Sequence, residues 1–78
     1  MSATAPTLLE SMRQVGALLH AADLRGADER LQAIVAEHPD HVEALRLLGG
    51  LRLGRGDVDG AEALLRKALT LDPHWAPT

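Results

Sequence analysis

The sequence predicts an all-α protein made of two stacked helix pairs, and three observations predict it. Pro39 and Pro73 stand 34 residues apart (73 − 39 = 34), and apolar residues recur with the 3.6-residue period of a helix. The same offset superimposes Gly16 on Gly50, Leu19 on Leu53, Asp23 on Asp57, Gly26 on Gly60, Ala27 on Ala61 and Leu31 on Leu65. The hydrophobic fraction of 46% is supplied mainly by Leu, Ala, Val and Ile, which favours helix over strand. A helical repeat of this length is typical of helix pairs that bury their apolar faces against each other.

Composition limits what the chain can do. A chain of 78 residues makes at most one small domain, and the absence of cysteine excludes disulfides and thiolate metal sites. The 8 basic and 11 acidic residues alternate in sign, and the chain has one Trp with no Phe or Tyr, so nucleic acid is not expected as a partner. There is no apolar run of transmembrane length and no export signal, so we expect a cytoplasmic protein without membrane contact.

The first helix is expected over about residues 8–21, after a flexible N-terminal tail at residues 1–7. Thr7 and Glu10 have the spacing of a capping box, in which each side chain bonds the backbone amide of the other residue. The apolar stripe that follows consists of Leu8, Met12, Val15 and Leu19.

The second helix is expected to begin after Asp23, whose carboxylate suits an N-cap, and to end just before Pro39. Its predicted inner face consists of Leu24, Ala27, Leu31, Ile34 and Val35.

The third and fourth helices are expected to repeat this scheme. Asp40 and Glu43 have the spacing of another capping box, Gly54-Arg55-Gly56 ends the third helix, and Asp57 caps the fourth. The fourth helix ends at Asp72-Pro73, and its predicted inner face consists of Ala61, Leu64, Leu65, Ala68 and Leu69. The first repeat thus covers residues 8–39, the second residues 40–75, and residues 76–78 form a C-terminal tail.

The second repeat resembles a tetratricopeptide repeat. That family places a large apolar residue, Leu, Gly and Tyr along its first helix, then Ala, Phe, Ala and Pro along its second. The corresponding residues here are Leu45, Leu48, Gly49 and Arg52, then Ala61, Leu65, Ala68 and Pro73. The first repeat shares Ala27, Leu31 and Pro39 with the pattern. Arg52 departs from it, and we expect the stem of this side chain to cover apolar surface.

The resemblance implies a short right-handed α-solenoid whose concave side binds peptides or proteins. On that side it would place Leu9, Met12, Leu19, His20, Arg46, Gly50 and Leu53. An apolar groove at Leu9, Met12 and Leu19 would suit an amphipathic partner helix or a self-contact. The alternative is that the first helix is rotated and buries Leu9 and Met12 in the core.

No residues are predicted to be catalytic, to ligate a metal or to bind a cofactor. His38-Pro39-Asp40-His41 contains metal-ligand side chains, but no distant pair completes a tetrahedral set. Arg55-Gly56-Asp57 spells an adhesion tripeptide, which helix stop and start signals explain fully. The Ser, Thr and His residues form no nucleophile-and-base grouping, so the chain is not expected to be an enzyme.

The sequence therefore predicts a scaffold for protein–protein interaction that binds a peptide or partner helix, or that self-associates. A homodimer is expected through the outer side of the fourth helix, which carries Leu65, Leu69 and Leu71, with Trp75 just beyond. The alternative is that the chain is the N-terminal accessory segment, for docking or dimerisation, of a larger bacterial enzyme such as a sulfotransferase, glycosyltransferase or iron and 2-oxoglutarate oxygenase. The ending at residues 74–78 reads like the opening of a third repeat and favours this alternative.

Overall fold

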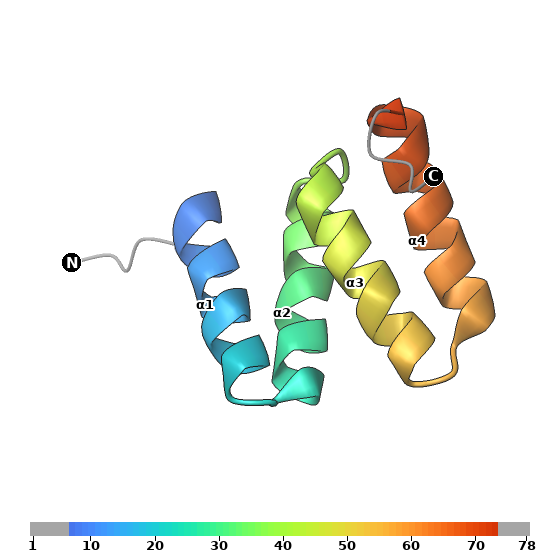
Figure 1. Ribbon diagram of the computed structural model, residues 1–78. Helices are drawn as coiled ribbons and strands as arrows, with labels where there is room; N and C mark the ends of the chain where they lie inside the picture. Colours follow the sequence, from blue (N-terminus) through green and yellow to red (C-terminus); the bar gives the residue numbers. More distant parts are fainter. Residues whose placement is uncertain (1–6, 74–78) are drawn as a thin grey trace.

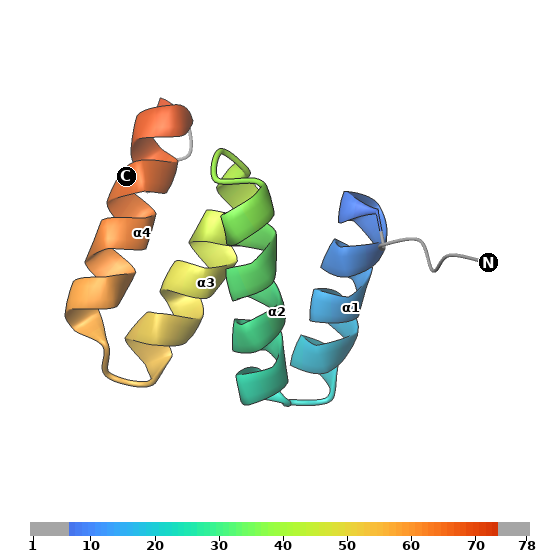
Figure 2. The same cartoon turned by 180° about the vertical axis from the view of Figure 1, so that it is seen from behind.

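The computed structural model describes residues 7–73, which form four helices in a row. They are α1 (Leu8–His20), α2 (Leu24–Glu37), α3 (Val42–Gly54) and α4 (Val58–Leu71). Figures 1 and 2 show that consecutive helices run antiparallel, each beside the next. The predicted all-α stack of two helix pairs is confirmed.

Three helices begin at the caps that the sequence predicts. Thr7 Oγ1 accepts a bond of 3.1 Å from the Glu10 amide, and Glu10 Oε1 accepts one of 2.9 Å from the Thr7 amide, which completes the capping box. Asp23 and Asp57 each accept a bond of 3.0 Å from the amide three residues on, at the starts of α2 and α4. The ends of α2 and α4, before Pro39 and Pro73, are also confirmed.

The predicted start of α3 is wrong. His41, not Asp40, is the N-cap, and its Nδ1 accepts a bond of 3.1 Å from the Ala44 amide. The His41 amide donates to the His38 carbonyl at 3.0 Å, so Asp40 lies inside the turn that joins α2 to α3. His41 occupies the place of Thr7 in the repeat (41 − 7 = 34), so the N-caps of α1 and α3 keep the 34-residue offset.

Two turns of the same form join the helices within each pair. Gly56 has φ 88° and Ala22, at the same place in the repeat, has φ 61°. After each of them, the next amide donates to a carbonyl five residues back, from Asp57 to Arg52 and from Asp23 to Leu18, both at 2.8 Å. This is the helix-ending motif that needs one residue in the left-handed region.

The core lies between the first three helices. Its buried members are Val15, Leu31, Ile34, Ala44 and Leu48. Small residues bring α3 and α4 together: Ala61 and Ala68 are buried, and a Cβ at Gly49 would lie 2.8 Å from Leu65 Cγ.

Two predicted inner-face residues are exposed, which corrects the sequence analysis. Leu24 is 55% exposed in the first turn of α2, where it lines a cleft between α2 and α3 instead of the core. Leu69 is 38% exposed, because it lies on the side of α4 that no other described helix covers.

Candidate functional site

One buried charge joins the two repeats. Asp28 on α2 is 5% exposed and is the buried charged residue of the described chain. Arg52 on α3 contacts both of its carboxylate oxygens, with Nε donating to Oδ2 at 2.9 Å and Nη2 donating to Oδ1 at 3.2 Å. Such two-point pairing adds geometric specificity as well as energy.

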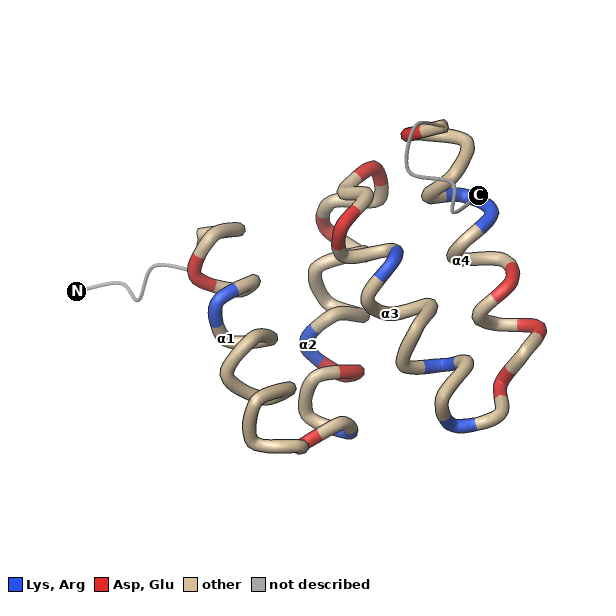
Figure 3. The backbone as a smooth tube through the Cα atoms, viewed as in Figure 1, with Lys and Arg blue, Asp and Glu red and all other residues tan. Residues whose placement is uncertain are grey.

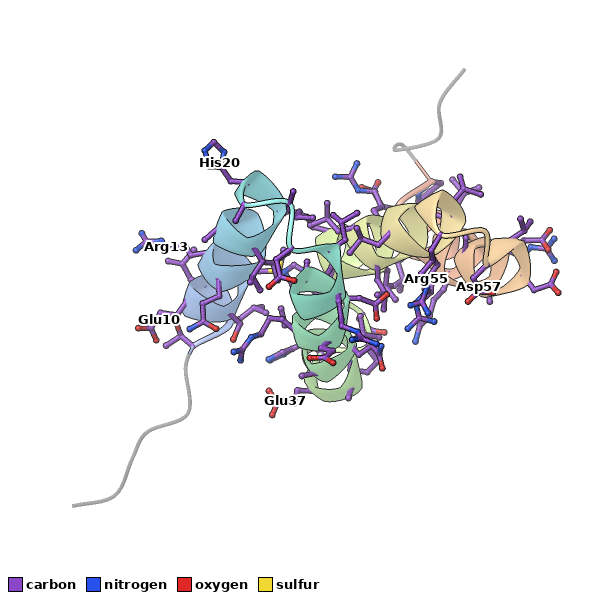
Figure 4. All side chains as sticks on the ribbon, turned by 90° about the horizontal axis from the view of Figure 1, so that it is seen from below. Glu10, Arg13, His20, Glu37, Arg55 and Asp57 are labelled. Carbon is purple, nitrogen blue, oxygen red and sulfur yellow. The ribbon has the colours of Figure 1, made fainter. Side chains whose placement is uncertain are left out.

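Further polar groups complete this ion cluster. Gln32 Nε2 donates to Asp28 Oδ1 from one turn further along α2, and Arg55 Nη1 lies 3.4 Å from Asp28 Oδ2. Arg52 Nη1 also lies 3.5 Å from Asp57 Oδ2, and Figure 4 shows Arg55 and Asp57 near the turn between α3 and α4. Every buried side-chain N or O atom in the described part of the chain has a hydrogen-bond partner.

The hydrogen bond from Arg52 lowers the pKa of the Asp28 carboxyl, although burial acts in the opposite direction. The same bond raises the pKa of Arg52. Both groups are therefore charged at neutral pH, and the pair ties α2 of the first repeat to α3 of the second.

This cluster is not among the features that the sequence predicts. From the sequence, Arg52 is expected only to cover apolar surface with its stem, and Asp28 has no expected role. A signal was present, because Asp28 falls four residues after Leu24 and three before Leu31. A charge between apolar neighbours on one helix face indicates a buried partner of opposite sign.

A cleft of about 620 Å³ lies between α2 and α3, beside the ion cluster. Figure 1 shows that the two helices diverge from the turn that joins them. The cleft is lined by Leu24, Arg25, Asp28, Glu29, Gln32, Gly50, Leu51, Gly54 and Arg55. A Cβ at Gly50 or Gly54 would meet nothing within 4 Å, so the α3 backbone is open to contact there.

A second, shallower hollow of about 470 Å³ runs along the outer side of α4 and reaches Leu53 in the last turn of α3; it is called the α4 groove below. It is lined by Leu53, Val58, Ala61, Glu62, Leu65, Arg66 and Leu69. Its charged residues, Glu62 and Arg66, pair with each other across one helical turn at 2.8 Å.

The residues predicted for the concave side do not share one hollow. Gly50 lines the cleft, whereas Leu53 lines the α4 groove. Arg46 is half-buried on α3, and His20 is exposed and points away from the helices in Figure 4.

The residues on which the two alternatives for the first helix depend differ in burial. Met12 and Leu19 are half-buried and pack against the core, as the rotated helix predicts for Met12. Leu9 is 63% exposed and is not buried in the core, so its place in a binding groove stays a prediction.

Of the residues predicted for self-association, Leu65 and Leu69 line the α4 groove. Leu71 is 40% exposed but does not line it. Trp75 lies outside the described residues.

The other motifs have structural roles. Among residues 7–73, no three His, Cys, Asp or Glu side chains come close enough together to hold a metal ion. In the tripeptide, Arg55 faces Asp28, Gly56 supplies the left-handed turn and Asp57 caps α4. None of the described helices is both long and apolar enough to span a membrane.

Comparison with known proteins identifies the repeat. The tetratricopeptide repeat family model matches residues 13–74, which is most of the chain. Neither the curated proteins nor the solved structures contain a match. The match covers the second half of α1 and all of α2, α3 and α4, including Arg52 and the turn glycine Gly56. The chain therefore belongs to the tetratricopeptide repeat family.

Proposed function

We propose that this chain is a protein–protein interaction module that binds a peptide or a helix of a partner protein in the cleft between α2 and α3. Membership of the family supports the general role, since its repeats generally bind protein partners. The lining of the cleft supports the proposed binding position, because it combines apolar side chains, open backbone and charges of both signs within one hollow.

Each part of the cleft has a use in binding. Gly50 and Gly54 let a partner approach the α3 backbone closely, and Leu24 and Leu51 offer apolar contact. The Asp28 carboxylate already accepts hydrogen bonds from Arg52 within the chain, so it requires no donor from a ligand.

The rim of the cleft carries Arg25, Glu29 and Arg55, which can pair with either sign of charge. The fitting ligand is thus a segment with a large apolar residue among polar ones. Figure 3 shows positive and negative residues interspersed along the described helices instead of gathered in one basic surface, so nucleic acid is not part of the proposal.

The test begins with peptide selection from a displayed random library against the immobilised chain. The affinity of an enriched peptide is then measured by calorimetry. Gly50→Gln or Gly54→Gln places a side chain in the open space of the cleft, so we expect binding to weaken at least about tenfold. Ala63→Gln, at an exposed α4 position that lines neither hollow, is the matched control and should bind like the unmutated chain.

Unchanged affinity in both glycine variants would refute the cleft as the binding place. Failure of the library to yield any binding peptide would count against the proposed function as a whole. Circular dichroism of each variant shows that the fold is retained.

The proposal holds for a free-standing module and for an accessory segment of an enzyme alike, because each requires a docking surface and neither requires a catalytic group in these repeats. A cytoplasmic location stays a prediction. Self-association is the second part of the proposed interaction function, and the α4 groove supports it.

A further inference from the structure

The outer side of α4 repeats the face by which α2 binds α3. The 34-residue offset places Val58, Glu62, Leu65 and Leu69 where α2 carries Leu24, Asp28, Leu31 and Val35. On α2, Leu31 is fully buried and Asp28 is paired with Arg52. On α4, Val58 is 59% exposed and Leu69 is 38% exposed. The outer face of α4 is therefore exposed and largely apolar, with the acidic residue Glu62 within it.

Stacking of copies end to start does not match this face. The core residues of α3 that pack with α2 include Ala44 and Leu48, and their places in α1 are taken by Glu10 and Gln14. Both are exposed, and Figure 4 shows Glu10 and Arg13 pointing outward from α1. An α1 helix laid on the α4 groove would press polar side chains against Leu65 and Leu69, which carries a desolvation cost.

The α4 face is complementary to itself instead. Val58, Glu62, Leu65 and Leu69 follow the spacing of one helix face. The midpoint of Glu62 and Arg66 is residue 64 ((62 + 66)/2 = 64), and that of Val58 and Leu69 is 63.5 ((58 + 69)/2 = 63.5). One two-fold axis therefore serves both the charged pair and the apolar pair.

We infer that α4 binds α4 of a second copy, antiparallel, about a two-fold axis near residue 64. Val58 then faces Leu69 of the second copy, Leu65 lies beside its own equivalent at the axis, and Glu62 pairs with Arg66 of the second copy. The Val58–Leu69 and Glu62–Arg66 contacts each occur twice, and the contact between the two Leu65 side chains occurs once, on the axis, as a two-fold interface requires. A contact through one helix face is modest, so we expect dissociation in the range of tens of micromolar.

This pairing deepens the proposed interaction function, on which it rests, by naming a second copy as a partner. The pairing uses the α4 groove, which is separate from the cleft, so the dimer proposal and the peptide-binding proposal can fail independently. A Leu69→Glu chain that is monomeric but still binds a selected peptide would show that the two functions are separate.

The first experiment compares two leucines of the same helix by sedimentation equilibrium, over about 5 to 500 µM. Leu69 is 38% and Leu71 is 40% exposed, but only Leu69 lines the α4 groove. Leu69→Glu should raise the dissociation constant at least about tenfold, because it places a carboxylate in an apolar contact. Leu71→Glu should leave it unchanged. A monomeric unmutated chain throughout, or equal effects of the two changes, would overturn the inference.

The second experiment tests the register by charge reversal. Glu62→Arg and Arg66→Glu each put like charges on both sides of the axis, so each variant alone should dimerise at least about tenfold more weakly. Mixed in equal amounts, the two variants should form a heterodimer as tight as the unmutated dimer, because every facing pair is again of opposite sign. The ion pair within one helix cannot produce this recovery. A mixture that stays as weak as its components would rule out the proposed register.

Discussion

At the scale of single residues, Asp28 is a buried charge whose stability depends on its partners. A carboxylate taken out of water is stabilised only while it is paired and hydrogen-bonded, and here Arg52 and Gln32 supply both conditions. The cluster orients the repeats relative to each other, because its two halves come from helices of different repeats. Loss of Asp28 or Arg52 leaves the other residue as a partly buried charge without its main partner, which destabilises the folded chain.

A double-mutant cycle measures that dependence. Asp28→Ala or Arg52→Leu alone should lower the free energy of unfolding by about 2–3 kcal/mol, less than for a fully buried pair because the Arg52 side chain is 21% exposed. The double variant should lose clearly less than the sum of the two, since no unpaired charge remains. Urea denaturation monitored by circular dichroism gives the three values, and simple additivity would mean that the pair contributes no coupling.

The pH dependence of stability follows from the lowered pKa of Asp28. A carboxyl whose folded pKa lies below its unfolded value of about 3.9 contributes stability that is complete above that value and is lost as the pH falls through the folded pKa. The unfolding free energy should therefore drop on acidification from about pH 4 downward, and Asp28→Asn should show a shallower drop. Identical acid profiles for the two chains would contradict this assignment.

Ala22 is a second residue whose environment is unusual. Its φ of 61° is left-handed, where a Cβ is crowded, and the second repeat has Gly56 at this place. Ala22→Gly should raise the free energy of unfolding by about 0.5–1 kcal/mol, net of the greater freedom of glycine in the unfolded chain. The reverse change, Gly56→Ala, should lower it by a similar amount. Thermal denaturation checks both, and a shift of the same sign in the two variants would disprove the strain.

At the scale of elements, α3 carries adjacent glycines with opposite roles. A Cβ at Gly49 would lie 2.8 Å from Leu65 Cγ and Cδ2, whereas one at Gly50 would meet nothing within 4 Å. Gly50→Ala should stabilise the chain by about 1 kcal/mol through helix propensity. Gly49→Ala should destabilise it by roughly 1–2 kcal/mol, because overpacking exceeds the same gain.

Chemical denaturation of this matched pair tests how closely α3 and α4 approach. If Gly49→Ala proved as stabilising as Gly50→Ala, the contact of Gly49 with Leu65 would not be tight. No contact within residues 7–73 requires glycine at position 50, because a Cβ there would meet nothing within 4 Å. This is consistent with a partner that contacts the helix backbone at that point.

At the scale of the whole molecule, the proposed pairing of α4 with α4 of a second copy would link stability to protein concentration. Dimers that form only from folded chains stabilise the fold by mass action. The melting temperature should rise by roughly 5 °C between about 5 and 500 µM for the unmutated chain, and should stay constant for Leu69→Glu. Differential scanning calorimetry measures both. A rise of equal size in the variant would place the association on another surface.

The sequence by itself determined the elements and their order. A cap acts on an amide three residues away and a proline acts on the residue before it, so Thr7, Asp23 and Asp57 and the two prolines could be interpreted from neighbours alone. The repeat then specified how many helices there are and that they pair. Where two adjacent side chains could both cap, as at Asp40 and His41, local chemistry was insufficient, and the structure has the cap at His41, 34 residues after Thr7.

Only the tertiary structure decided the contacts between helices and the hollows on the surface. Asp28 and Arg52 are 24 residues apart in sequence, and their contact depends on the angle between α2 and α3. The rotation of α1, which packs Met12 against the core and leaves Leu9 exposed, depends on the shape of its neighbour. The cleft beside Gly50 is set by how far two helices diverge. Such features arise from the relative placement of several helices, whereas capping and periodicity act within a single helix, which is why the sequence predicts the helices and not the hollows between them.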